Sequence, residues 1–494
     1  MWINRGLLVW TIPLGAMLGA TPLAGGSFGA LGGQVHAGPD GHLIGHGHRL
    51  LLLVGDSGTQ CVMQNLNIDY RRWIDDCARA GLNAIHIWSF VAPRQRRDGT
   101  VTERRYGYVY PGVTPWARRD AGPKAHDGWR QWNLLEFDEG EDPCRHYWPR
   151  LRDLCRHAKR RGLLVGISVF FGWPKHNTAA RPDWAYHPFN LLNGGHLTDH
   201  RPIVQVVQQI ASPGREVLDL PWSDSWQPSM KTQWLWERFA AKLLKETLPL
   251  GNTFYVFMDE RSYPEGNCGD HFARFFRRRN AFWVDGELRR RTVDGVVDGT
   301  GPNREINRIA GDAFRREPAR PFLEFELPPY RGDAVRENLY ACLLGGGHYF
   351  FHDDEQQETP TTGIMSYDPH VRAGRREAVR ERLQWLGVAC RVMNERLRQL
   401  PRMAPHNEAI RQGSGYCLAR PGQEYLVYVR SGATITLGVE PAAGRFRVQA
   451  ISPRTGRTAR ATPRVSDAGL RVELPDSADW LLHVRRTGPS APAR

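Results

Sequence analysis

The chain lacks the sequence features that define several large protein classes. After about residue 24 it has no apolar run long enough to cross a membrane as a helix. None of its eight cysteines forms a CxxC pair. Its arginine-rich stretches at 276–279 and 289–291 lack interleaved aromatic residues and the patterns of helix-turn-helix, RRM or zinc-finger proteins. We therefore expect no zinc site, no membrane span in the mature chain and no nucleic-acid partner.

The composition is that of a folded protein with a basic surface. The chain has 494 residues, of which 41% are hydrophobic and 24% charged, which is enough to bury one large core and an accessory domain. The formal net charge of +14 favours polyanions such as an acidic polysaccharide, although a solvated basic face is the simpler interpretation. Seventeen Trp, 15 Tyr and 19 Phe are suited to stacking on sugar rings as well as to packing in a core.

The N-terminal segment has the pattern of a signal peptide. One positive charge at Arg5 is followed by an apolar stretch from Gly6 to about Ala24, and then by a glycine-rich run. Small-residue cleavage sites end at Ala20, Ala24 and Ala37, and the sequence does not choose among them. We assign residues 1–37 to a signal peptide and linker, which predicts a secreted, periplasmic or cell-envelope protein.

Four cysteines lie in apolar helical patterns. Cys77, Cys155, Cys342 and Cys390 each occupy a position expected to be buried, where a free thiol is the simpler state. The even number of cysteines also suits an oxidising compartment, so disulfide pairing stays open.

Residues 38–403 alternate short apolar strands with amphipathic helices, the pattern of a parallel α/β fold. The first unit has a strand at 50–54 that ends in Gly55-Asp56-Ser57, then a helix that opens at Asp69 and ends at Gly81. Seven more strands are predicted at 83–88, 163–171, 253–258, 281–285, 292–297, 321–326 and 348–352. The count of eight predicts a (β/α)₈ TIM barrel.

From about residue 404 the pattern changes to short strands of period two. They are predicted at 425–429, 434–439, 446–451, 470–474 and 480–484. Turn residues separate them, so residues 404–486 are expected to form a small antiparallel β-sandwich domain, followed by a disordered tail at 487–494.

Polar residues gather where the predicted barrel strands end, which is where such barrels carry their functional side chains. Asp259-Glu260 follows strand four, and Glu326 ends strand seven. Two carboxylates at these positions would face each other across the barrel mouth. Retaining glycoside hydrolysis needs such a pair about 5 Å apart, one as acid/base and one as nucleophile.

Several motifs together resemble a known group of enzymes. The segments "LLLVGDSGTQ", "CARAGLNAIHIWSF", "HPFNLLNGG" and "FYVFMDE", with the helix and strand around residues 137–173, resemble the clan of retaining (β/α)₈ glycoside hydrolases. That clan includes glycoside hydrolase family 5 and the apiosidase-like catalytic domains. The C-terminal part, with "ISPRTGR", resembles the β domain named for collagen binding that follows such barrels. The resemblance covers residues 38–486.

The resemblance implies a role for two glutamates. The clan's acid/base is the Glu of an Asn-Glu pair that ends strand four, and the matching residue here is Glu260. Asp259 stands where the clan has Asn, which would add like charge beside the acid/base. Glu326 matches the strand-seven nucleophile. Glu324 shares its strand parity and stays an alternative, as does a residue on strand eight.

Other residues are expected to bind the substrate. Trp88 and Trp173 are candidates for the floor of sugar subsites, and His176, His187 and Asn190 for bonds to hydroxyl groups. The remaining candidates for the pocket lining are Asp56, Asp259, Tyr330, His348, His352 and Asp353. Although His352, Asp353 and Asp354 have metal-ligand types, adjacent acidic residues in a loop are usually solvated, so we expect neither a metal nor a cofactor.

The sequence thus predicts a glycoside hydrolase with a carbohydrate substrate, for which the basic surface suits an acidic, uronate-bearing glycan. A second hypothesis is a catalytically inactive barrel that binds glycans or cell-surface polymer. The substitution of Asp259 for Asn motivates it, because a fold does not fix a function. Neither the linkage nor the oligomeric state follows from the sequence.

Overall fold

The computed structural model describes most of the chain from residue 34 to residue 487. The described ranges are 34–58, 61–90, 113–171, 183–198, 228–259, 268–284, 303–316, 319–325, 332–352, 364–369, 376–439, 445–466 and 469–487. The expected signal peptide before residue 34, the strand expected at 292–297 and the tail after residue 487 lie outside them. Within these ranges, no helix is long and apolar enough to cross a membrane.

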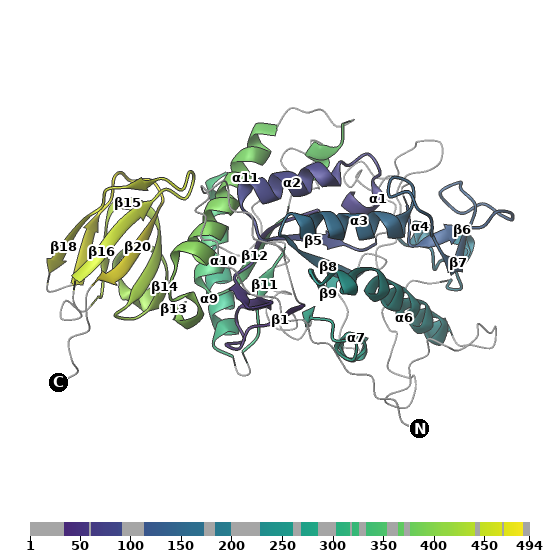
Figure 1. Ribbon diagram of the computed structural model, residues 1–494, viewed down its shortest axis with the longest axis horizontal. Coiled ribbons are helices and arrows are strands. Elements are labelled where there is room, and N and C mark those ends of the chain that lie inside the picture. Colours follow the sequence, from purple (N-terminus) through teal and green to yellow (C-terminus); the bar gives the residue numbers. More distant parts are fainter. Residues whose placement is uncertain are drawn as a thin grey trace, which may run out of the picture.

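A parallel sheet forms the centre of the larger domain (Figure 1). In the described ranges it has seven strands in the order β10-β9-β8-β5-β4-β12-β11. Their bounds are β4 Val54–Ser57, β5 Ala84–Trp88, β8 Leu164–Phe171, β9 Thr253–Asp259, β10 Trp283–Val284, β11 Leu323–Glu324 and β12 His348–Phe351. Numbered as in the sequence prediction, this order is five, four, three, two, one, eight, seven. It is the cyclic order of a (β/α)₈ barrel, in which the sixth strand expected at 292–297 lies outside the described ranges.

The sheet is strongly curled, as shown by side chains from distant strands that meet on one face. The rings of Phe254 in β9 and Phe350 in β12 lie 6.3 Å apart, although three strands separate them in the sheet. Phe325, directly after β11, lies 4.2 Å from the ring of His86 in β5. We call this concave side the barrel interior.

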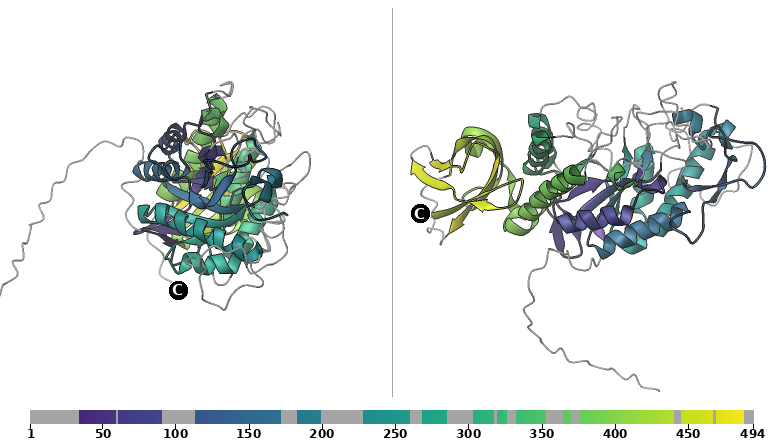
Figure 2. Two further views of the ribbon diagram at one scale, coloured as in Figure 1. Left: turned by 90° about the vertical axis from the view of Figure 1, so that its right-hand side faces the viewer. Right: turned by 90° about the horizontal axis from the view of Figure 1, so that it is seen from above.

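Helices cover the convex side of the sheet (Figures 1 and 2). The bounds of the α-helices in the described ranges are α1 Cys61–Gln64, α2 Tyr70–Ala80, α3 Tyr147–Arg160, α4 Asp183–Tyr186, α6 Pro228–Thr247, α7 Cys268–Arg277, α9 Asn303–Phe314, α10 Asp333–Leu344 and α11 Arg376–Arg391, of which α4 lies beyond the sheet. The expected boundaries of α2 are confirmed: the Asp69 side chain accepts the Arg72 N–H at 3.0 Å, and Gly81 ends the helix with a φ of 94°. Cys77, Cys155, Cys342 and Cys390 are buried free thiols, as predicted.

The apolar run at 50–54 is not one strand, which corrects the sequence prediction. Its first part belongs to β3 (Arg49–Leu51), and the barrel strand β4 begins only at Val54. Between them, side chains replace strand partners: the Leu52 N–H donates to Asn394 Oδ1 at 2.9 Å and the Leu53 N–H to His348 Nδ1 at 2.7 Å. The chain leaves one sheet and enters another without an exposed turn, so the sequence shows no break there.

An antiparallel sheet of β1 (Val35–Ala37), β2 (Ile44–His46) and β3 closes the lower end of the barrel interior. Val35, Ile44 and Leu51 pack in the same apolar cluster as Leu53 and Leu164. Cleavage after Ala37, one of the three expected points, would remove β1 and its pairing with β2, while the choice among the three points stays a prediction.

The C-terminal domain is antiparallel, as expected, but its strands are joined differently. Its bounds are β13 Ala404–Pro405, β14 Ile410–Arg420, β15 Glu424–Leu437, β16 Arg445–Ile451, β17 Thr458–Ala459, β18 Thr462–Ser466, β19 Gly469–Glu473 and β20 Trp480–Thr487. The two strands predicted at 425–429 and 434–439 form one strand, β15, whose first part pairs with β20 and whose second part pairs with β19. Gly432, with a φ of 104°, and an irregular register around Gly413 in β14 let the chain bend instead of turning.

The β domain packs against the barrel through a buried charge cluster. Arg336 of α10, whose side chain is 1% exposed, donates to both carboxylate oxygens of Asp479, at 2.9 and 3.3 Å. The same carboxylate accepts the Tyr428 hydroxyl at 3.1 Å and pairs with Arg454. The Tyr428 ring stacks on Tyr340 of α10 at 4.9 Å. Figure 1 shows the β domain beside α9 and α10, at the end of the molecule opposite the β6–β7 hairpin (Trp116–Arg118 and Trp132–Phe137).

We predict that Asp479→Asn lowers the free energy of unfolding by about 2–4 kcal/mol, because it removes the buried one of the two carboxylates that pair with Arg336 and leaves only the exposed Asp333. Denaturation by urea measures the change. Asp312→Asn is the matched control, since Asp312 pairs with Arg308 at the exposed surface of α9 and such a pair contributes about 1 kcal/mol or less. Equal effects of the two variants would contradict the assignment.

Candidate active site

The carboxyl ends of the parallel strands form the candidate site, and the described residues define its base. Asp259 is the last residue of β9 and pairs with Phe171 of β8. The proposed catalytic residues and several proposed substrate contacts lie outside the described residues: Glu260, Glu326, Trp173, His176, Tyr330 and Asp353. The described interior therefore shows what surrounds the site and which candidates face it.

A hydrogen-bonded row crosses three neighbouring strands inside the barrel. His86 of β5 bonds through Nδ1 to Ser57 Oγ of β4 at 3.1 Å, and through Nε2 to Ser168 Oγ of β8 at 2.9 Å. Phe325 and Phe350 pack on its ring at 4.2 and 6.1 Å. All three polar side chains are at most 2% exposed, so the row gives the interior a fixed polar layer.

Trp88 and His352 lie together at the carboxyl end of this interior. Trp88 shares a face of β5 with Ala84 and His86, and its ring stacks on that of His352, just after β12, at 5.7 Å and 28°. Burial lowers the pKa of His352 to about 4, so the imidazole is neutral at neutral pH. The sequence prediction that both residues belong to the pocket agrees with this position, while their contact with a sugar stays a prediction.

Asp56 faces away from the interior, which corrects its assignment to the substrate pocket. Its carboxylate accepts Trp73 Nε1 of α2 at 2.9 Å and Arg382 Nη2 of α11 at 3.0 Å, and both side chains of the ion pair are at most 4% exposed. Successive strand residues point to opposite faces, so Ser57 takes the inward position. Asp56 therefore joins the first strand to the helices behind it.

Glu324, the alternative nucleophile, also lies on the convex side. Its strand partner Tyr349 packs in the core between sheet and helices, whereas the flanking Leu323 and Phe325 pack in the interior. Burial and the Glu324 carboxylate both raise the pKa of the Cys342 thiol in α10, which places the carboxylate beside that helix. This position excludes Glu324 from the barrel mouth.

His348 lies at the wrong end of its strand for a substrate contact. It begins β12, accepts the Leu53 N–H at Nδ1, and donates from Nε2 to the His42 carbonyl at 2.9 Å. It therefore joins the barrel strand to the N-terminal sheet at the lower end. Complete burial outweighs the His42 carbonyl and lowers its pKa to about 4.

His187 and Asn190 shape a loop at the carboxyl side. The His187 Nδ1 accepts the Phe189 N–H at 3.1 Å, and burial, followed by His196, lowers its pKa to about 3. Asn190 caps the short helix at 191–193 by accepting the Leu192 N–H at 3.0 Å and donates to the Trp184 carbonyl at 3.1 Å. Both side chains thus hold the loop, and their expected bonds to sugar hydroxyls stay untested.

Sequence reasoning missed His86, Ser57 and Ser168. The signal was present in "AIHIW", where His86 shares its strand face with Trp88. In "VGDS" the same alternation makes Ser57, and not Asp56, the residue that points into the interior. Among the described residues, no group of three His, Cys, Asp or Glu side chains could hold a metal ion.

Comparisons with known proteins support the fold. No protein-family model matches the chain, and no curated protein matches its sequence. A solved glycoside hydrolase family 5 structure from Bacteroides vulgatus is similar, with a TM-score of 0.50, 14% identity and coverage of 92% of this chain and 94% of that chain. Another structure, titled only as a glycoside hydrolase, has a TM-score of 0.48, 12% identity and coverage of 93% and 98%. At 14% identity, the similarity to the family 5 structure shows a barrel-type fold and not an activity.

The buried histidines predict how stability depends on pH. The folded pKa of His348 is about 4 and its ordinary value is 6.5, so between these values the unfolded chain binds a proton that the folded chain does not. The contribution is complete above pH 6.5 and is lost as the pH falls toward 4, by up to about 3 kcal/mol.

We expect His348→Gln to flatten this pH dependence, measured by urea unfolding at several pH values from 7 to 4. The exposed His126 serves as the control, and His126→Gln should keep the slope of the unmodified protein. An unchanged slope in His348→Gln would refute the assignment.

Proposed function

We propose that the protein is a glycoside hydrolase that cleaves glycosidic bonds in a poly- or oligosaccharide with retention of configuration. The observation that carries the proposal is the cyclic strand order around one curled sheet, in which β9 and β11 hold positions four and seven. Closure into a full (β/α)₈ barrel by a sixth strand is part of the proposal.

The two proposed carboxylates follow these strands directly in the sequence. Glu260 comes immediately after Asp259, the last residue of β9, and Glu326 comes two residues after β11. The curl brings the two strands to opposite sides of one interior. Glu326 attacks the anomeric carbon while Glu260 protonates the leaving oxygen, and Glu260 then activates water to release the sugar from Glu326.

The described interior supplies two properties that this chemistry uses. Its base is buried and hydrogen-bonded, because His86 bonds to Ser57 and Ser168 and aromatic rings pack around the His86 ring. Trp88 and neutral His352 lie next to the mouth. Because neither carries a positive charge, neither would form an ion pair with the carboxylate nucleophile. The basic surface suits an acidic glycan, and the N-terminal pattern suits a secreted or envelope protein.

Hydrolysis of neutral and acidic polysaccharides and aryl glycosides tests the proposal. We expect Glu260→Gln and Glu326→Gln each to lower kcat by about 10²- to 10⁴-fold or more. Glu324→Gln is the matched control, since its carboxylate faces the helices and its loss should leave kcat within a few-fold of wild type. NMR of the first anomer released tests retention.

The outcomes separate the alternatives. Activity that survives in Glu326→Gln would place the nucleophile elsewhere. Binding of glycans without turnover across the panel would favour the inactive glycan-binding barrel, which the Asp259 substitution motivates.

A further inference from the structure

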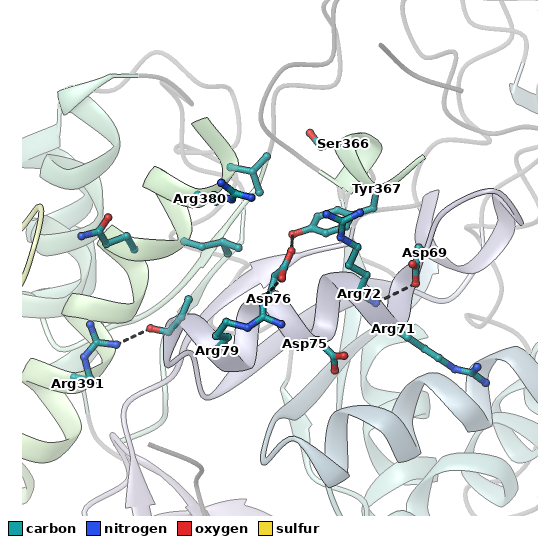
Figure 3. A pocket seen from close by; sticks show the side chains of 14 residues that line it. Asp69, Arg71, Arg72, Asp75, Asp76, Arg79, Ser366, Tyr367, Arg380 and Arg391 are labelled. Atoms are coloured by element: carbon teal, nitrogen blue, oxygen red, sulfur yellow. Dashed lines mark hydrogen bonds and ion pairs between the residues drawn. The ribbon is translucent and has the colours of Figure 1, made fainter. Parts of the chain in front are cut away.

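A charged groove lies on the outer flank of the barrel, between its first and last helices. It is formed by α2, α11 and the short helix at Ile364–Tyr367, and has a volume of about 840 Å³. Figure 3 shows Arg72 of α2 and Arg380 of α11 on its two walls. The groove lies on the convex side of the sheet, where α2 and α11 pack together.

The acidic side chains of the groove are already engaged. Asp69 caps α2, and Asp76 pairs with Arg79 and accepts the Tyr367 hydroxyl at 3.1 Å. Asp75 receives His157 Nε2 at 2.6 Å and Arg161 Nε at 2.7 Å. Although burial acts to raise the pKa of Asp75, these two hydrogen bonds outweigh it and hold the pKa below its ordinary value. No carboxylate of the groove therefore needs a further cation.

Of the groove's arginines, Arg72 and Arg380 keep their charge available for a ligand. By contrast, Arg71 pairs with Asp153 at 2.8 Å, and Arg391 donates to the Ala80 carbonyl at 2.6 Å. Within the described residues, the guanidinium groups of Arg72 and Arg380 contact no carboxylate, and both residues are exposed. The lining contains five arginines and three aspartates, so positive charge is in excess.

The other lining residues narrow the class of ligand. Val379 and Leu383 are buried apolar side chains in the wall, while Ser366 and Gln384 offer hydrogen-bonding groups. Arginine forks bind carboxylates in a two-pronged geometry, apolar walls suit the C–H faces of sugar rings, and polar groups suit hydroxyls. Inorganic phosphate would use only the arginines.

The length of the groove suits a chain of several units. Arg380 and Arg391 are eleven residues apart on α11, which corresponds to about 16 Å along a helix. The Ala80 carbonyl holds the guanidinium of Arg391 without neutralising its charge, so positive charge is spread over this length and matches a polymer with repeated carboxylates better than a single small anion.

We propose that this groove is a second carbohydrate site, which binds a uronate-bearing oligosaccharide through Arg72 and Arg380. It holds an acidic polymer on the flank of the barrel while another part of the polymer enters the mouth. The choice of a glycan over another polyanion rests on the proposed function.

Isothermal titration with an α-1,4-galacturonate hexasaccharide tests the proposal, in a Glu260→Gln background that prevents turnover. We expect the double variant Arg72→Gln/Arg380→Gln to weaken binding at the groove at least tenfold. Added salt should weaken binding to the unmodified groove more strongly than to the variant. Arg445→Gln/Arg471→Gln, two exposed arginines of the β domain, makes the same change in net charge and should alter affinity less than twofold.

Two results would overturn the inference. Equal losses in the two double variants would show attraction to net charge alone. Tighter binding of a hexaglutamate peptide than of the hexasaccharide, lost with Arg72 and Arg380, would make the groove a site for acidic peptides. Groove binding in a protein that hydrolyses no glycan would refute the proposed function and leave this site standing.

Discussion

Burial of both faces of the parallel sheet is the constraint on which the rest of the structure depends. Each strand residue must point either into the interior or toward the helices, and the choice alternates along the chain. At the end of β4, Asp56 therefore points toward the helices and contacts Arg382, while Ser57 points into the interior and contacts His86. A shift of one residue would bury the carboxylate among aromatic rings and break the ion pair behind the sheet, so the register decides which residues can take part in chemistry.

Much of the fold could be predicted from the sequence because its elements end at clear signals. Asp69 and Gly81 mark the two ends of α2, and the apolar runs at β5, β8 and β9 agree with the structure within one residue. The break before β4 could not be predicted, since Asn394 and His348 supply the missing hydrogen bonds from more than 290 residues away. The site was harder to predict because it depends on the exact alignment of each strand in the sheet. The sequence locates the strand ends, but that alignment decides which face Asp56 and Glu324 occupy. It also places His348 at the start of β12 instead of its end.

The continuous apolar run Tyr425–Val429 also reflects a strand with both faces buried. Tyr425, Val427 and Val429 pack inside the β domain, while Leu426 and Tyr428 join the core that surrounds α10. Both faces of β15 are thus covered, and the β domain is fixed to the barrel by apolar packing as well as by the Arg336–Asp479 pair. A binding surface on this domain would keep a constant distance and direction relative to the barrel mouth.

The sheet that closes the lower end of the barrel also sets an order of assembly. Its strands precede the barrel strands in the sequence, and the side chains that fasten it come from both partners: His46 of β2 bonds to the Gly251 carbonyl across 205 residues, and His348 bonds to Leu53 and His42 across 295 and 306 residues. Contacts so distant in sequence form late. The N-terminal strands therefore complete their attachment only when β12, at the far end of the parallel sheet's sequence, is in place, and a fold closed by such long-range contacts is expected to form slowly.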